Sequence, residues 1–281
     1  MKTVEGIADM KRARHSLAGS LGFVPTMGYL HRGHLELVRR AREENECVAV
    51  SIFVNPTQFN SREDFSQYPR DTERDLALLE GEGVDLVFIP DAGEMYTRGF
   101  DSWVGVEGIT GRLEGASRPG HFRGMATVVA KLFNIVEPTR AYFGQKDALQ
   151  LLVIKKMVAD LNMNLEVVAV PTVREEDGLA MSSRNVHLDP QERRAALVLW
   201  RALDLVRSLY SAGQRDADRL RSEMNALLEG EPLARLDYAS IADADTLEEL
   251  NRMDGPALVS LAIWIGKTRL IDNLVLGTQV S

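Results

Sequence analysis

The 281-residue chain has a single cysteine, Cys47, which excludes an intramolecular disulfide. Cys47 lies in the apolar run ECVAVSIFV, which is typical of a buried strand, and we interpret it as a core thiol. No apolar run reaches about 18 residues, the length that spans a bilayer, and the N-terminal twenty residues carry charges throughout, unlike a signal peptide. These absences predict a cytoplasmic protein with no membrane partner.

Positive charge is also scarce, because the chain has 33 Lys and Arg residues but 41 Asp and Glu residues, which gives a net charge of −8. No long basic block occurs, so the chain lacks the basic footprint of a nucleic-acid-binding protein. A local cationic pocket for a small anion is still compatible with this balance. Nucleic acid is therefore not an expected partner.

Two common nucleotide-binding signatures are missing. No G-x-G-x-x-G follows the first apolar run at residues 21–24, which excludes the dinucleotide fingerprint. The triplet GKT at 266–268 resembles the end of a P-loop, but Leu261 stands where the upstream glycine is required. A nucleotide site, if present, must use other residues.

The first part of the chain alternates short apolar runs with longer helical patterns. Strands are predicted at residues 21–24, 47–54, 84–90, 140–144 and 165–171, and helical patterns occupy 34–44, 71–83, 125–136 and 148–161. Strands this apolar, separated by helices, favour a parallel sheet covered on both faces. The sequence predicts an α/β domain here.

The pattern changes near Glu176, where EEDG offers charge and a turn glycine. Helical patterns then run from about Gln191 to Tyr210 and from Asp216 to Leu228, followed by strand-like runs at 233–243, 256–266 and 268–276. We therefore expect two domains: residues 1–175 form the α/β domain, and residues 176–281 form a smaller α+β domain.

Two of the five histidines, His31 and His34, lie three residues apart around Gly33, where a predicted strand gives way to a helix. A helix N-terminus presents unpaired N–H groups and positive potential, which suit phosphate oxygens. Two structural histidines or a metal-binding pair are the alternatives at this spacing. Metal ligation is disfavoured because no histidine or cysteine cluster elsewhere completes a coordination shell.

Six blocks of sequence together resemble one family. They are PTMGYLHRGH (25–34), FVNPTQF (53–59), RPGHFRG (118–124), YFGQKDALQ (142–150), VPTVREEDGLAMSSRN (170–185) and IGKTRLIDN (265–273). In this order they resemble pantothenate synthetase, also called pantoate–β-alanine ligase, within the H-x-G-H nucleotidyltransferase superfamily. Gln145 departs from the commonest pattern, in which glutamate precedes the lysine.

The resemblance implies a fold and a reaction. The fold is a Rossmann-like N-terminal domain that binds ATP and pantoate and carries catalysis, followed by a C-terminal lid domain, in a homodimer that requires Mg²⁺. The reaction is the ATP-dependent condensation of pantoate with β-alanine to pantothenate through a pantoyl adenylate, with release of AMP and pyrophosphate.

The resemblance also implies roles for individual residues. It makes His34, His31 and Lys146 catalytic, Gln58 and Gln150 pantoate-binding, and Gln58 also β-alanine-binding. Asp75 is the candidate metal ligand. Arg118, His121 and Arg123 are expected near the site without individual roles. The ATP contacts it implies are Met27, Gly28, His31, His34, Gly144, Lys146, Asp147, Val173, Met181, Ser182, Ser183 and Arg184.

Two other functions are weighed against this one. Another H-x-G-H nucleotidyltransferase, moving AMP or CMP onto a phosphorylated acceptor, would need cations for a second phosphate where this chain has Gln58 and Gln150. A non-catalytic nucleotide-binding protein of the same fold would be expected to lose part of the phosphate clamp, the set of side chains expected to hold the ATP phosphates. In this chain both histidines, Lys146 and MSSR are present.

Overall fold

The computed structural model describes residues 1–277. The chain divides into two compact units: the first comprises residues 1–144 and 149–171, and the second comprises residues 145–148 and the chain from Thr172 onward. The domain boundary expected from the sequence, after residue 175, lies a few residues later and places residues 145–148 in the first domain. Within the described residues, no helix is long and apolar enough to cross a bilayer.

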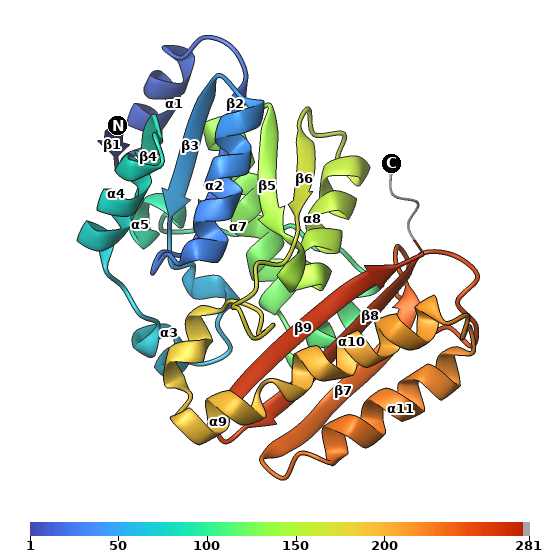
Figure 1. Ribbon diagram of the computed structural model, residues 1–281. Coiled ribbons are helices and arrows are strands. Elements are labelled where there is room, and N and C mark those ends of the chain that lie inside the picture. The colour runs from blue at the N-terminus through green and yellow to red at the C-terminus, as the bar shows by residue number, and fades with distance from the viewer. Residues whose placement is uncertain (278–281) are drawn as a thin grey trace. The chain divides into compact units, whose positions relative to one another are not determined.

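A six-stranded, fully parallel sheet forms the centre of the first unit (Figure 1). The predicted strands are confirmed, and a short edge strand at the N-terminus, with only three residues, was not predicted. The strand order is β1-β4-β3-β2-β5-β6, with bounds β1 Lys2–Val4, β2 Leu21–Thr26, β3 Cys47–Ile52, β4 Leu86–Phe88, β5 Arg140–Gly144 and β6 Glu166–Val170.

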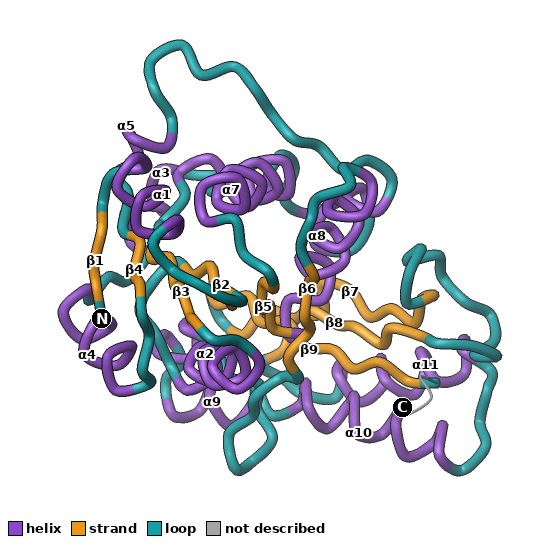
Figure 2. Tube along the Cα trace, turned by 90° about the horizontal axis from the view of Figure 1, so that it is seen from above, coloured by secondary structure: helices purple, strands orange, loops and turns teal. Residues whose placement is uncertain are grey.

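Helices cover both faces of this sheet, as expected for parallel strands (Figure 2). The helices α2 (Arg32–Glu44) and α4 (Thr72–Gly81) lie on one face, and α1 (Ile7–His15), α7 (His121–Val136) and α8 (Ala148–Asp160) lie on the other. Shorter helices are α3 (Arg62–Gln67), α5 (Ala92–Met95) and α6 (Glu114–Ser117).

The helix α2 is held to the sheet by an apolar stripe. Leu37, Val38 and Ala41 share one side of the helix and belong to the same buried cluster as Val48 and Val50 of β3. Full burial of each large aliphatic side chain contributes about 1.5–3 kcal/mol. This packing fixes the N-terminus of α2 relative to the sheet.

The strand order reverses between β2 and β5. From β2 the chain proceeds to β3 and β4 on one side, whereas β5 leads to β6 on the other, and β2 pairs directly with β5 through Gly22 and Phe23. Open α/β sheets bind ligands outside the carboxyl ends of the strands at such a switch point. The sheet topology therefore predicts a ligand site beside the carboxyl ends of β2 and β5, after Thr26 and Gly144.

The second unit contains a three-stranded antiparallel sheet against which α10 and α11 pack. The helix predicted from Gln191 to Tyr210 is divided into two helices. The hydrogen-bond pattern changes at Ala196–Leu197, where the N–H of Leu197 donates to the carbonyl of Arg194, three residues earlier. The bounds are α9 Pro190–Ala195, α10 Val198–Ser211, α11 Ala217–Glu229, β7 Ala234–Asp243, β8 Ala257–Ile265 and β9 Thr268–Leu276.

The interpretation of Cys47 as a core thiol needs correction. Cys47 begins β3 and is only half-buried, whereas the rest of the strand is buried, because the first residue lies at the N-terminal end of the strand. Its Sγ lies 3.6 Å from the carbonyl oxygen of Ala18. Desolvation, with the nearby Asp85 carboxylate, raises the pKa of the thiol, which keeps it protonated and weakly nucleophilic.

Candidate active site

A tight turn connects β2 to α2. Gly28 and Tyr29 both have positive φ values, +82° and 53°. A Cβ on Gly28 would also meet Ile52 Cγ2 at 3.0 Å and Asp75 Oδ2 at 3.1 Å. Glycine is therefore favoured at this position both by conformation and by space.

The carboxylate of Asp75 holds this turn in place. Asp75 lies in α4 with only 1% of its surface exposed, and its two oxygens accept hydrogen bonds of 2.7 Å from the backbone N–H groups of Tyr29 and Leu30. A buried carboxylate needs such charge-assisted partners. The contacts with the turn give Asp75 a structural role that the sequence did not reveal.

The expected metal-binding role of Asp75 is not tested by these contacts and stays a prediction. Among residues 1–277, no group of three or more His, Cys, Asp or Glu side chains is placed to hold a metal ion.

His31 and His34 form the N-terminal cap of α2. The Nδ1 of His31 accepts a hydrogen bond from the Gly33 N–H at 3.1 Å, and the Nδ1 of His34 accepts one from the His31 N–H at 3.3 Å. The rings lie 4.1 Å apart between centroids. Because a backbone N–H can only donate, each neutral ring carries its proton on Nε2. Each imidazole can thus donate a hydrogen bond from Nε2 to an anion at the helix N-terminus.

Gln58 lies in the turn that follows β3, and it is buried with 7% of its surface exposed. Its Oε1 accepts a hydrogen bond from Asn55 Nδ2 at 3.0 Å, and its Nε2 lies 3.1 Å from the sulfur of Met27. Asn55 in turn donates to the carbonyl of Gly124 and accepts from the Tyr96 hydroxyl at 2.7 Å. The structure thus brings the predicted residues Met27 and Gln58 together.

The RPGHFRG block supports the same turn. His121, at the start of α7, donates from Nδ1 to the carbonyl oxygen of Gln58 at 2.7 Å, and Arg118 lies 3.4 Å from its Nε2. The guanidinium of Arg123 instead lies over the Trp103 ring, 5.0 Å from its centre. Of these three residues, His121 is therefore the one that directly braces Gln58.

Gly144 and Gln150 lie at the carboxyl end of β5. Gly144 is the last residue of the strand, and Gln150 is half-buried in the first turn of α8. Since β5 pairs with β2, both residues lie on the edge of the sheet from which the turn at residues 27–31 also leaves.

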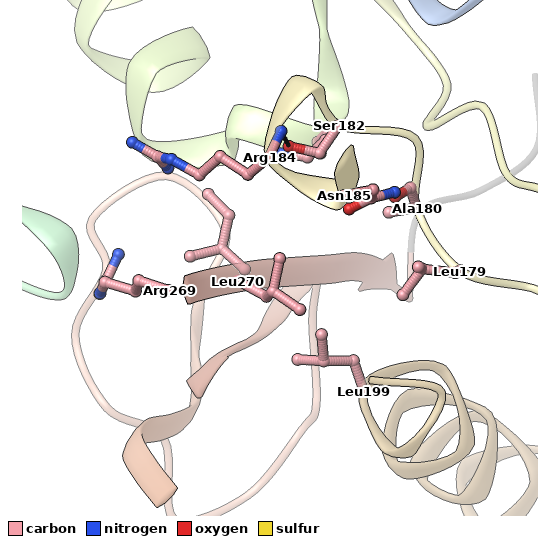
Figure 3. A pocket seen from close by; sticks show the side chains of 10 residues that line it. Leu179, Ala180, Ser182, Arg184, Asn185, Leu199, Arg269 and Leu270 are labelled. Carbon is pink, nitrogen blue, oxygen red and sulfur yellow. Dashed lines mark hydrogen bonds between the residues drawn. The ribbon is translucent and has the colours of Figure 1, made fainter. Parts of the chain in front are cut away.

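The second unit has a pocket that contains much of the predicted phosphate clamp (Figure 3). Lys146, Ser182 and Arg184 line it, together with Asn185 and Arg269, which were not predicted. Figure 3 shows the side chains of Arg184 and Arg269 extending toward the same side. Its apolar lining comes from Leu179, Ala180, Leu199, Leu270 and Ile271.

The charges in this pocket differ in how they are paired. The Lys146 side chain is 19% exposed, and its Nζ lies 3.4 Å from Asp147 Oδ1. Arg269 contacts Asp237 at 2.6 Å, so its charge is partly balanced within the sheet. Arg184 also lines the pocket, and its side chain is exposed. Three cations around a small hollow suit an anionic ligand.

The serines of MSSR belong to a well-bonded loop. The Val173 carbonyl accepts from the Met181 N–H at 2.9 Å, which closes the segment like a hairpin. The Ser182 hydroxyl accepts from the Arg184 N–H at 3.3 Å, and Ser183 begins a 3₁₀ helix, Ser183–His187. Backbone bonding of this kind places Ser182 and Arg184 on a defined frame.

Two supporting residues were missed by reasoning from sequence. Asn55 was visible in the NPTQF block, and an asparagine directly after a buried strand was the available signal. Arg269 was visible in GKTRLIDN, but a lone arginine in a strand-like run gives no signal of its own.

Comparison with known proteins agrees with these observations. The model of the family described as pantoate-beta-alanine ligase matches residues 1–275. A pantothenate synthetase from Roseiflexus sp. (strain RS-1) is 60% identical over 276 residues, covering 98% of this chain and 99% of that protein.

Solved structures agree as well. The crystal structure of pantothenate synthetase from Thermus thermophilus superposes with a TM-score of 0.93 at 52% identity, covering 98% of this chain and 99% of that one. The pantoate-beta-alanine ligase from Francisella tularensis, complexed with β,γ-ATP and β-alanine, has a TM-score of 0.80 at 36% identity and covers 100% of both chains. The chain described here belongs to the pantoate–β-alanine ligase family.

Proposed function

We propose that this protein catalyses the ATP-dependent condensation of pantoate with β-alanine, forming pantothenate, AMP and pyrophosphate. The observation that carries the proposal is the pair of histidines capping α2 at the carboxyl edge of β2, with buried Gln58 beside the same turn. Membership of the family over residues 1–275 supports it, as does the ligand pair, β,γ-ATP and β-alanine, of the Francisella tularensis relative.

The proposed chemistry has two steps. The carboxylate oxygen of pantoate attacks the α-phosphorus of ATP, the bond to the β-phosphate oxygen breaks, and pyrophosphate leaves. The amine of β-alanine then attacks the acyl carbon of the pantoyl adenylate, AMP leaves with the bonding electron pair, and a proton is lost from nitrogen. Such a reaction requires positioning and charge stabilisation more than a protein nucleophile.

We infer that the phosphates are held by hydrogen bonds and by cations. His31 and His34 donate from Nε2, and Lys146 and Arg184 supply positive charge that balances the charge developing on the leaving pyrophosphate. His34, His31 and Lys146 are the proposed catalytic residues. The remaining proposed ATP contacts are Met27, Gly28, Gly144, Asp147, Val173, Met181, Ser182 and Ser183.

The proposed pantoate contacts are the amides of Gln58 and Gln150. Pantoate carries two hydroxyls and a carboxylate, and an amide offers both donors and an acceptor without adding charge. Gln58 is proposed to contact β-alanine as well. Its burial and its bond to Asn55 fix the direction in which its Nε2 donates.

Three further properties rest on the family resemblance alone: a requirement for Mg²⁺, a homodimeric state and a lid role for the C-terminal domain. Because the described residues do not build a metal cage, we propose that Mg²⁺ is held mainly by the nucleotide phosphates and water. A cytoplasmic location also stays a prediction.

The proposal is tested by ATP–pyrophosphate exchange with pantoate present and β-alanine absent. Adenylate chemistry requires that labelled pyrophosphate enters ATP only when pantoate is added. A nucleotide-binding protein without catalysis gives no exchange under any condition. A different nucleotidyltransferase gives exchange that responds to a phosphorylated acceptor and not to pantoate, and either result would refute the proposal.

A further inference from the structure

The block IGKTRLIDN ends in β9 at Asn273, a residue with no role in the reaction as proposed. Asn273 is buried, with 4% of its surface exposed. Its Nδ2 donates to the backbone carbonyls of Gln145 at 3.0 Å and of Lys146 at 2.8 Å. Its Oδ1 accepts a hydrogen bond of 3.1 Å from Gln145 Nε2. Every polar atom of this side chain is therefore directed at the segment that carries Lys146.

These contacts lie within the second unit, to which residues 145–148 belong. An asparagine amide has two N–H donors and one carbonyl acceptor, and here both donors go to consecutive backbone carbonyls. The acceptor is fixed by a bond from the same segment, so the amide has one orientation that satisfies all three bonds. These bonds therefore fix the position of the backbone at Lys146, although the lysine side chain itself makes none of them.

Asn273 is supported by buried neighbours. It lies in the edge strand β9 and pairs with Ser260 of the central strand β8. Its neighbour Asp272 is 2% exposed and accepts two hydrogen bonds from Arg174, at 2.6 and 3.0 Å, as well as the N–H of Asn273 at 2.8 Å. Such a bidentate pair has a defined geometry as well as strength.

Two consecutive residues of β9 thus hold two segments that meet in one pocket. Asn273 holds residues 145 and 146, and Asp272 holds Arg174, where the loop toward Ser182 and Arg184 begins. Lys146, Ser182 and Arg184 all line the pocket of Figure 3.

We propose that Asn273 is a positioning residue of the ATP phosphate site, which fixes the backbone of Lys146 so that its ammonium group faces the pocket lined by Ser182 and Arg184. This inference rests on the proposed role of Lys146 in binding the phosphates. Asn273 touches no substrate and acts through Lys146. A displacement of about 1 Å in such a group lowers a rate about a hundredfold.

The test is a double-mutant cycle on pantoate-dependent ATP–pyrophosphate exchange, with Asn273→Asp and Lys146→Ala. Aspartate has the same shape as asparagine but no N–H donor, and it presents oxygen to two carbonyl oxygens. We expect Asn273→Asp to lower kcat of exchange about a hundredfold in the otherwise wild-type chain. In the Lys146→Ala background the same change should cost less than about threefold, because the group it positions is gone.

A matched control separates positioning from general loss of stability. Met224→Ala creates a cavity in α11, at a fully buried residue of an apolar cluster in the same unit that includes none of residues 145–148. It should lower the melting temperature and leave kcat of exchange within about threefold at temperatures where the protein is folded. If Asn273→Asp does not fold, Gln145→Ala takes its place in the cycle. This substitution removes the hydrogen bond from Gln145 Nε2 to Asn273 Oδ1, and Gln145 is only half-buried.

The outcomes are distinct. If Asn273→Asp, or Gln145→Ala in its place, costs equally in both backgrounds, the effects are independent and the positioning role is wrong. If the wild-type protein shows no pantoate-dependent exchange, it is the proposed function that fails. The cycle is then measured on ATP affinity by calorimetry, where strong coupling between positions 273 and 146 supports positioning and additive losses overturn it.

Discussion

Asp75 accepts a hydrogen bond of 2.7 Å from the backbone N–H of Leu30, and its other oxygen accepts one of the same length from Tyr29. These bonds link α4 to the turn that leads into His31. Because Asp75 is almost fully buried, the carboxylate depends on these donors for its solvation. The position of the histidine pair therefore depends on a charge in a different helix.

We predict that Asp75→Asn lowers both stability and adenylate formation. The amide oxygen can accept one of the two N–H groups, but the NH₂ group faces the other donor. Leaving one buried donor unsatisfied costs about 1–3 kcal/mol of unfolding free energy. Displacement of the histidine pair should lower pantoate-dependent exchange by about tenfold or more. Urea unfolding and the exchange assay measure the two effects.

The magnesium dependence of the same variant distinguishes anchoring from metal ligation. An anchor leaves the Mg²⁺ concentration that gives half-maximal exchange unchanged, whereas loss of a ligand raises it severalfold. Glu73→Gln is the control, because it neutralises an exposed carboxylate in the first turn of the same helix. A large rise in the required Mg²⁺ for Asp75→Asn alone would show that Asp75 is primarily a metal ligand.

His34 has two separable tasks, and two substitutions distinguish them. In His34→Asn the side-chain oxygen can replace Nδ1 as acceptor for the His31 N–H, while the donor at the Nε2 position is lost. We expect the melting temperature to stay near the wild-type value while adenylate formation falls about a hundredfold, the usual effect of losing one preorganised donor, about 3 kcal/mol. His34→Ala should lose both the cap and the rate.

Single-turnover kinetics of each half-reaction locate the defect of His34→Asn. Reaction of supplied pantoyl adenylate with β-alanine forms no pyrophosphate, so it should be affected much less than adenylate formation. If the variant forms adenylate at the wild-type rate and is slow only with the amine, His34 does not act on the phosphates.

The two proposed pantoate amides should respond differently to truncation. Gln150→Ala is expected to raise the KM for pantoate about tenfold or more and to change the KM for ATP by less than about threefold, because a hydroxyl partner is lost and no phosphate contact is removed. Gln58→Ala should do the same and also destabilise the protein, since it leaves Asn55 Nδ2 without its 3.0 Å partner. A collapse of ATP affinity with unchanged pantoate affinity would show that the two pockets are assigned the wrong way round.

The sequence predicted the elements that follow from apolar periodicity and from turn residues. The β2 run at 21–24 and the glycine at 28 follow rules that operate over a few residues, so the strand-to-helix turn was predictable. The Asp75 contact with Leu30 spans 45 residues, and the Asn273 contact with Lys146 spans 127. No local pattern distinguishes a buried carboxylate of this kind from a solvated one on α4, so such contacts required the fold.

The division of the second domain shows the same limit at short range. Apolar periodicity continues from Gln191 to Tyr210, and it does not register the change of hydrogen bonding at Ala196–Leu197 that separates α9 from α10. Likewise, Cys47 has the residue type and neighbours of a core position, and only its place at the first residue of β3 leaves it half-buried.

Tyr142 gives a prediction about pH that is independent of the reaction. Its hydroxyl reaches the C-terminal end of α2, where it donates to Glu44 at 2.9 Å and accepts from Asn45 at 2.7 Å. Burial, together with the Glu44 carboxylate, raises the pKa of Tyr142 to about 12. Arg40, which bonds to Glu44, in turn lowers the pKa of Glu44, so that side chain stays ionised as the acceptor at neutral pH.

The sign of the effect follows from linkage. Tyr142 binds its proton more tightly in the folded state than in the unfolded state, where the pKa is about 10. Its contribution to stability is therefore fully present below pH 10 and is lost as the pH rises through about 12, because the unfolded chain ionises first. We predict that the free energy of unfolding of the wild-type protein falls more steeply between pH 10 and pH 12 than that of Tyr142→Phe.

At pH 7 the Tyr142→Phe variant should be less stable by about 1 kcal/mol, since the Asn45 amide loses its acceptor. Urea unfolding at each pH gives the comparison, and parallel pH profiles for the two proteins would show that Tyr142 ionises as readily in the folded chain as in the unfolded one.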